Sequence, residues 1–232
     1  MSLSEKVVLV TGATGGLGPA VVRHFKDQGA QVVAMGRSME SLNSHFANSN
    51  ISRKTCDLLN AEEVKKCVED VIAEKSRIDI LVCVAGGFAM GSTVYETPME
   101  QWELMNDLNV KTVLNMVREV IPGMLEQKAG KVITVGATAA HHGMAQMGTY
   151  CASKSALMRF TEALAMEVRT KGINVNAVLP TIIDTPDNRN AMPDADYDRW
   201  VAPEDLANVI GFLTSDAAKA VHGALIPVTG LS

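Results

Sequence analysis

The chain has 232 residues, 47% of them hydrophobic, which is enough for one α/β domain with a sizeable core. A net charge of −5 argues against nucleic acid as a partner, because phosphate binding requires clustered Lys and Arg and the sequence has no such cluster. The four cysteines form no CxxC pair, so their spacing fits neither a zinc site nor a small disulfide scaffold.

The first apolar run, Val7-Val8-Leu9-Val10, is too short for the core of a signal peptide or for a membrane span. Reduced thiols in a cytosol are the favoured interpretation of the cysteines. We therefore expect a cytoplasmic, soluble protein with no membrane partner and no metal.

Short apolar and β-branched segments alternate with longer segments of helical periodicity, which is typical of βαβ units around a parallel sheet. The predicted strands are residues 7–10, 31–35, 53–56, 80–84, 131–135, 174–179 and 225–228. The predicted helices are residues 17–28, 39–47, 60–75, 99–126, 150–170 and 203–214. No linker or low-complexity segment divides the chain, so we expect residues 1–232 to form a single domain.

A glycine-rich turn follows the first predicted strand directly and opens the first predicted helix. Its sequence is Thr11-Gly12-Ala13-Thr14-Gly15-Gly16-Leu17-Gly18. The glycines permit a tight turn and let backbone N–H groups approach a pyrophosphate, and the helix N-terminus adds positive potential. Because the Lys-Ser/Thr ending of a P-loop is missing, the turn predicts dinucleotide binding and not ATP or GTP hydrolysis.

The end of the second predicted strand, Gly36-Arg37-Ser38, bears on which dinucleotide binds. An acid at this place would accept hydrogen bonds from the adenosine ribose, whereas a cation beside a small residue accommodates a 2′-phosphate. Gly36 and Arg37 stand where the acid would be, so NADP(H) is favoured over NAD(H).

Residues 181–201 follow the sixth predicted strand, show no clear periodicity and are rich in Pro, Asp and Asn. A loop of about 20 residues is uncommon in a compact domain unless it is functional. It should lie at the carboxyl edge of the sheet, where ligands bind in α/β folds. We therefore predict that this loop closes over a small-molecule substrate.

Tyr150 and Lys154 are four residues apart near the start of a predicted helix, so they share one face. A lysine cation about 4 Å from the phenol would favour phenolate by roughly 4 kcal/mol at an effective dielectric constant near 20. The expected result is a tyrosine pKa lowered toward neutral pH, which suits general acid/base chemistry. Taken alone, such a pair is more often a surface helix pair.

The combination of motifs resembles the short-chain dehydrogenase/reductase family over nearly the whole chain. The residues that carry the resemblance are Thr11-Gly12-xxx-Gly16-x-Gly18, Asp57, Ala85-Gly86, Asn109, Tyr150-xxx-Lys154 and Pro180-xxxx-Thr185. The resemblance implies a Rossmann-type, doubly wound parallel sheet of about seven strands in three αβα layers. It also implies hydride transfer between a nicotinamide cofactor and a carbonyl, alcohol or imine.

The family's functional residues carry over onto matching positions of this sequence. Tyr150 resembles the general acid/base, Lys154 the residue that binds the nicotinamide ribose, and Asn109 the anchor of a proton-relay water. The implied cofactor-binding residues are Gly12, Thr14, Gly15, Gly16, Leu17, Gly18, Gly36, Arg37, Ser38, Asp57, Leu58, Ala85, Gly86, Gly87, Tyr150, Lys154, Pro180, Ile183 and Thr185.

The serine that usually holds the substrate oxygen in this family is replaced by Ala137. Losing one such donor typically costs about 10²- to 10³-fold in rate. Three explanations stay open: Thr138 supplies the hydroxyl from the next position, the chain binds a dinucleotide without turnover as a regulatory or structural protein, or the substrate does not need the serine.

The third explanation has support from a narrower resemblance to the dihydropteridine reductases of this family, which also carry alanine at this position. The matching segments are Leu81 to Gly87, Gly136 to Ala140, and Asp184-Thr185-Pro186-x-Asn188-Arg189. A quinonoid dihydropterin accepts hydride into a conjugated C=N system, so charge spreads over several ring atoms and a single serine donor matters less. Arg37 and Phe88 depart from the pattern of that group.

The predicted helices 99–126 and 150–170 carry more apolar residues than one buried face requires. In the family these helices commonly form the dimer core, so the resemblance implies a homodimer or homotetramer. The sequence thus predicts an NAD(P)H-dependent reductase of a C=O or C=N group, with Tyr150, Lys154, Asn109 and Thr138 as candidate catalytic residues.

Overall fold

Seven parallel strands form one sheet in the computed structural model, which describes residues 3–47 and 49–232. The strand order β3-β2-β1-β4-β5-β6-β7 reverses direction between β1 and β4, as in a doubly wound fold. The strands are β1 (Val7–Thr11), β2 (Gln31–Gly36), β3 (Ser52–Thr55), β4 (Ile80–Cys83), β5 (Gly130–Val135), β6 (Ile173–Pro180) and β7 (Leu225–Val228). The predicted fold class is confirmed.

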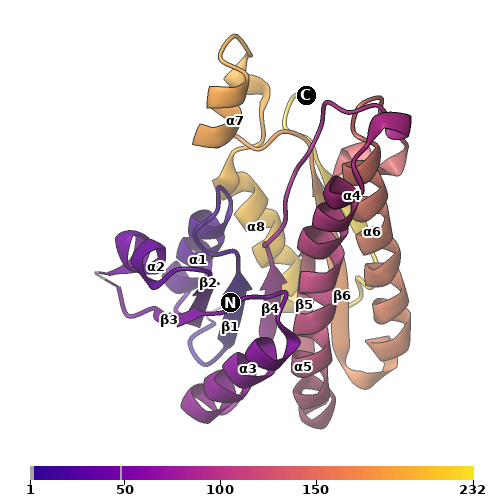
Figure 1. Cartoon of the computed structure of the whole chain (residues 1–232). Helices are drawn as coiled ribbons and strands as arrows, with labels where there is room; N and C mark the ends of the chain where they lie inside the picture. The colour runs from indigo at the N-terminus through magenta and orange to yellow at the C-terminus, as the bar shows by residue number, and fades with distance from the viewer. Residues whose placement is uncertain (1–2, 48) are drawn as a thin grey trace.

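Helices cover both faces of the sheet, which gives the three layers of Figure 1. The helices are α1 (Gly18–Asp27), α2 (Met39–Phe46), α3 (Ala61–Lys75), α4 (Met99–Asn106), α5 (Thr112–Gln127), α6 (Gly148–Val168), α7 (Pro186–Ala191) and α8 (Pro203–Thr214). Within the described part of the chain, none of them is both long and apolar enough to cross a membrane.

Alternate residues of the strands supply two separate cores. Val7 and Leu9 of β1 lie in one apolar cluster with side chains of α3, α5 and α6. Val8 and Val10 of the same strand lie in a second cluster with side chains of α1, α2 and α8. Because successive strand residues point to opposite faces, an unbroken apolar run is what a strand covered by helices on both sides requires.

The helix predicted at 99–126 is interrupted, which corrects that prediction. A π-helical turn at Asp107–Lys111 separates α4 from α5. The extra residue in this turn accompanies a buried, hydrogen-bonded Asn109, and such bulges are frequent at functional sites. Apolar periodicity alone does not reveal one inserted residue.

The segment 181–201 lies above the carboxyl ends of the strands, at the edge that the chain between β4 and α4 also reaches (Figure 1). It is more regular than its sequence indicates. Thr185 caps α7 by accepting a hydrogen bond from the Asn188 N–H at 3.3 Å, and Pro186 opens the helix. A bridge between Ile183 and Val201 ties the two ends of the segment together.

Candidate active site

The glycine-rich turn joins β1 to α1 and packs against the chain that leaves β4. Gly12 has a φ of +62°, which favours glycine, and a Cβ there would lie 2.6 Å from the Ala85 nitrogen. The Ala85 N–H in turn donates to Thr11 Oγ1 at 3.4 Å. The turn and the loop after β4 are therefore held as neighbours at the topological switch point of the sheet.

The N-terminus of α1 offers a site for an anion. Leu17 makes no side-chain capping bond, and the first turn of the helix carries no acid. A Cβ on Gly16 would lie 2.5 Å from Thr185 Cγ2, so a glycine at this position lets the segment 181–201 approach the turn closely. Backbone N–H groups at an uncapped helix start suit a pyrophosphate.

The residues predicted to meet the adenosine end lie at the ends of β2 and β3. Arg37 is exposed and makes no ion pair with any carboxylate of the described residues. The Ser38 hydroxyl accepts the Ser41 N–H at 3.3 Å and so caps α2. Asp57 is exposed and accepts the Leu59 N–H at 3.0 Å, whereas the Leu58 side chain is buried.

Asn109 is completely buried in the π-helical turn and binds the loop after β4. Its Oδ1 accepts the Gly87 N–H at 2.9 Å, and its Nδ2 donates to the Gly87 carbonyl at 3.1 Å and to Ser153 Oγ at 3.0 Å. A Cβ on Gly86 would lie 2.8 Å from Asn109 Oδ1 and 3.2 Å from Lys154 Nζ. Gly86 therefore brings Asn109 and Lys154 to one place.

Lys154 is buried on α6, and its Nζ donates to the Val135 carbonyl at 2.7 Å. Burial lowers the pKa of Lys154 to about 8, because the apolar surroundings disfavour the charged form. The family resemblance places Lys154 at the cofactor ribose, and its position against Gly86 is compatible with that prediction.

Tyr150 lies one turn before Lys154 on α6 and packs edge-to-face on Phe88, with ring centroids 4.8 Å apart. Burial raises the pKa of Tyr150 to about 12. The predicted lowering of this pKa by Lys154 is wrong for this structure. The desolvation of the phenol dominates, and the Lys154 ammonium is bound to the Val135 carbonyl.

The position of the missing serine lies in a small apolar cluster. Ala137 is 4% exposed and packs with Met158 and Leu179, while Tyr150 lies against the same cluster. The hydroxyl of Thr138 donates to the Pro180 carbonyl at 3.1 Å, so its proton is committed there and not to the surroundings of Tyr150. A catalytic role for Thr138 stays a prediction.

The segment 181–201 has a polar network of its own. Arg189 binds Asp184 through two hydrogen bonds of 2.6 and 2.7 Å and lies over the Tyr197 ring, 4.5 Å from its centroid. Asn188 Nδ2 donates to the Ile183 carbonyl at 2.8 Å. The predicted cofactor residues Ile183 and Thr185 are therefore held in place by hydrogen bonds to Asn188 of α7.

Two contacts at the site were missed in the sequence: the packing of Phe88 on Tyr150 and the bond between Ser153 and Asn109. A polar residue at the buried position between Tyr150 and Lys154 is a signal that could have identified Ser153. The Phe88 contact joins distant segments, and local pattern does not encode it.

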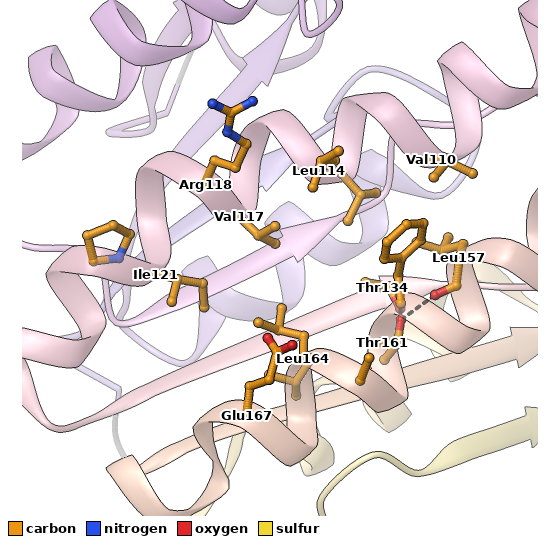
Figure 2. Close-up of a pocket in the computed structure, with 15 residues that line it drawn as sticks. Val110, Leu114, Val117, Arg118, Ile121, Thr134, Leu157, Thr161, Leu164 and Glu167 are labelled. Carbon is orange, nitrogen blue, oxygen red and sulfur yellow. Dashed lines mark hydrogen bonds between the residues drawn. The ribbon is translucent and has the colours of Figure 1, made fainter.

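An apolar cavity of about 370 Å³ lies elsewhere, between α5 and α6 (Figure 2). None of the predicted site residues lines it. Figure 2 shows apolar side chains of the two helices facing each other, with Arg118 on α5 and Glu167 on α6. Both charged side chains are exposed, and neither is in an ion pair among residues 3–47 and 49–232.

Comparison with known proteins agrees with this geometry. Residues 6–196 match the family described as short chain dehydrogenase. The chain is 32% identical over 240 residues to a 3-oxoacyl-[acyl-carrier-protein] reductase of Rickettsia felis, covering 99% of this chain and 98% of the relative. It is 30% identical to the human mitochondrial dehydrogenase/reductase SDR family member 2, covering 99% of this chain and 87% of the relative.

Solved structures agree as well. A short-chain type dehydrogenase/reductase from Mycobacterium ulcerans superposes with a TM-score of 0.92 at 26% identity, covering 100% of this chain and 90% of that one. A xylitol dehydrogenase solved with NAD+ superposes with a TM-score of 0.91 at 22% identity, covering 99% and 100% of the two chains, which shows likeness of fold alone.

Proposed function

Because the chain belongs to the short-chain dehydrogenase family and is therefore an oxidoreductase, we propose that it prefers NADPH and reduces a conjugated C=O or C=N group. The observation that carries this proposal is the arrangement of Tyr150 and Lys154 on one face of α6. Lys154 lies against Gly86, in the loop that the family resemblance assigns to the cofactor.

The residues present fit a dinucleotide. Gly12 and Gly16 stand where a Cβ would close the turn against Ala85 and Thr185, and the uncapped start of α1 suits the pyrophosphate. The exposed Arg37, which forms no ion pair within the described residues, supports a preference for the 2′-phosphate of NADPH. When bound, NADPH supplies the hydride and leaves as NADP+.

The chain's own contribution to the reaction is the proton. As hydride adds to one atom of the C=O or C=N bond, the bonding pair moves to the other atom, which takes the proton of the Tyr150 phenol. With a pKa raised to about 12, Tyr150 holds its proton at neutral pH and is suited to donate in the direction of reduction.

The surroundings of Tyr150 support a conjugated substrate. Ala137 offers no hydroxyl, and Thr138 has committed its proton to Pro180. A simple ketone would gather charge on one oxygen and lose about 10²-fold or more without a second donor, whereas a conjugated ring spreads that charge. Phe88, 57% exposed beside Tyr150, gives a flat ring a surface for stacking. A quinonoid dihydropterin is one such substrate, and a ring quinone is another.

The test is NADPH oxidation, followed by absorbance, with a quinonoid dihydropterin, a ring quinone, a simple ketone and an acetoacetyl thioester. We expect the conjugated rings to have the highest kcat/KM and NADPH to be used better than NADH. Tyr150→Phe should lower kcat by about 10²-fold or more while the NADPH dissociation constant stays nearly unchanged.

Two other outcomes would overturn the proposal. The highest kcat/KM with the acetoacetyl thioester would assign the activity named for the Rickettsia felis relative. NADPH binding without turnover of any compound would assign the alternative, a dinucleotide-binding protein with a regulatory or structural role.

The proposal includes a homodimer or homotetramer formed through α5 and α6, with a second copy of the chain as the occupant of the cavity between them. Leu114 and Phe160, at 41% and 52% exposure, lie on this face. Arg118 and Glu167 have opposite charges on opposite helices. In a symmetric pair, each Arg118 meets Glu167 of the other copy, which leaves no charge unpaired at the rim.

A further inference from the structure

Ser153 is completely buried on α6, between Tyr150 and Lys154. Its Oγ donates to the Tyr150 carbonyl at 2.9 Å and accepts from Asn109 Nδ2 at 3.0 Å. Because a serine hydroxyl has one proton, Ser153 donates in the bond to Tyr150 and can only accept in the bond from Asn109. Ser153 thereby links the π-helical turn to the first turn of α6.

The directions of these hydrogen bonds follow from which atoms can only donate or only accept. The Tyr150 carbonyl can only accept, so the Ser153 proton points to it. The Gly87 N–H can only donate, so Asn109 Oδ1 faces it, and Nδ2 donates both to the Gly87 carbonyl and to Ser153 Oγ. The chain of bonds from Gly87 through Asn109 and Ser153 to Tyr150 therefore runs one way, and a flipped Asn109 amide would break it.

Other buried hydroxyls do not have this connection. Thr112 and Thr161 bond the carbonyl four residues before them, as helix threonines commonly do, and Thr161 also meets Thr134. Ser155 on the same helix bonds the Ala140 carbonyl. Among the described hydroxyls, only that of Ser153 accepts a hydrogen bond from Asn109.

We infer that Ser153 is a positioning residue, whose hydroxyl anchors the Asn109 amide together with the Gly87 backbone and so holds the Gly86-Gly87 loop in place against Tyr150 and Lys154. The inference rests on the function proposed above for this site. Ser153 contacts neither substrate nor cofactor in this account and acts through Asn109.

Amide hydrogen exchange tests the link without any need for turnover. The Gly87 N–H is bonded to Asn109 Oδ1, and Ser153→Ala removes one of the two oxygen acceptors of Asn109 Nδ2. The loosened Asn109 amide should speed exchange at Gly87 by about tenfold, the equivalent of one hydrogen bond. The matched control is Ser155→Ala, which removes a hydroxyl two residues further along α6 and should leave the exchange rate at Gly87 unchanged.

A double-mutant cycle tests the same link in catalysis. Ser153→Ala should lower kcat by about tenfold in the native background and have almost no further effect in Asn109→Ala, because the two act as one unit. Should the Asn109→Ala protein fail to fold, the exchange measurement decides by itself. A wild-type protein without turnover would contradict the proposed function but leave the exchange result as the test of Ser153.

Two results would overturn the inference. One is an exchange rate at Gly87 that does not change in Ser153→Ala. The other is a fall in kcat that is equally large with and without Asn109, since that would make Ser153 independent of Asn109.

Discussion

At the scale of single residues, burial shifts the pKa values of Tyr150 and Lys154 in opposite directions and favours the neutral form of each. It raises the phenol pKa to about 12 and lowers the ammonium pKa to about 8, so in both side chains the charged form is disfavoured. The buried Lys154 cation donates to the Val135 carbonyl and is paired with no carboxylate among the described residues, so its burial costs folding free energy. This is the kind of strain that a functional site retains.

The cost predicts how stability depends on pH. The folded pKa of Lys154 is below its ordinary value of 10.5, so the unfolded chain binds the proton more tightly between about pH 8 and pH 10.5. The destabilisation is full below pH 8 and is relieved as the pH rises. Relative to Lys154→Met, the native chain should therefore gain about 3 kcal/mol in free energy of unfolding across this window.

Urea unfolding of both proteins at several pH values between 7 and 10 checks this prediction. The difference between them removes contributions from tyrosines and cysteines that titrate in the same range. A difference that stays constant with pH would show that Lys154 is not destabilised by its burial.

Substitution of Ala137 by serine should change the range of substrates that the protein reduces. In Ala137→Ser, a hydroxyl enters the position beside Tyr150 that carries the substrate-oxygen donor in most of the family. We expect kcat/KM for a simple ketone to rise by about 10²-fold, because one more donor stabilises localised charge on oxygen. For a conjugated ring the change should be less than about threefold, since the charge is already spread.

The readout is the ratio of the two kcat/KM values, measured by NADPH oxidation. Thr138→Val separates the two neighbouring positions, because it removes a hydroxyl that is bound to the Pro180 carbonyl. An unchanged ratio would assign the substrate range to position 137, whereas a fall in both kcat/KM values would assign Thr138 a catalytic role. An equal rise for both substrate types in Ala137→Ser would contradict the argument for delocalised charge.

At the scale of elements, the sequence predicts what depends on local pattern. The seven strands are apolar runs bounded by helical periodicity, and each is found within a few residues of its predicted range. The doubly wound order of the strands is predicted by the family resemblance, and the right-handedness of βαβ crossovers is its physical reason. The glycine turn, too, is visible because Gly12 needs a positive φ that few other residues adopt.

What the sequence does not predict depends on contacts between distant segments. The π-helical turn at Asp107–Lys111 carries Asn109, whose hydrogen-bond partner Gly87 is 22 residues away along the chain. The pKa of Tyr150 depends on the burial of its ring beside Phe88, and a pair spacing of four residues carries no information about that burial. Spacing and the family resemblance therefore predict the residues of the candidate site, but not the pKa values that burial gives them.

At the scale of the whole molecule, the site and the apolar α5–α6 face are separate. Tyr150 lies at the start of α6, near the carboxyl edge of the sheet, whereas the cavity extends along α6 from Leu157 to Glu167. Association through α5 and α6 would therefore bury Phe160 and leave the segment 181–201 free to meet a substrate (Figures 1 and 2).

This separation makes the assembly testable without touching the catalytic residues. In a symmetric pair, Arg118→Glu places two carboxylates together at each rim, and Glu167→Arg places two cations together, so either change alone should weaken association by about tenfold or more. The double variant Arg118→Glu/Glu167→Arg restores opposite charges and should return the dissociation constant close to that of the native chain. Sedimentation velocity over a range of concentrations measures all four proteins. Two results would contradict the pairing of Arg118 with Glu167 of another copy. One is a native chain that stays monomeric; the other is a double variant whose association is weakened by the sum of the two single effects, because the reversals cancel only where these two side chains meet.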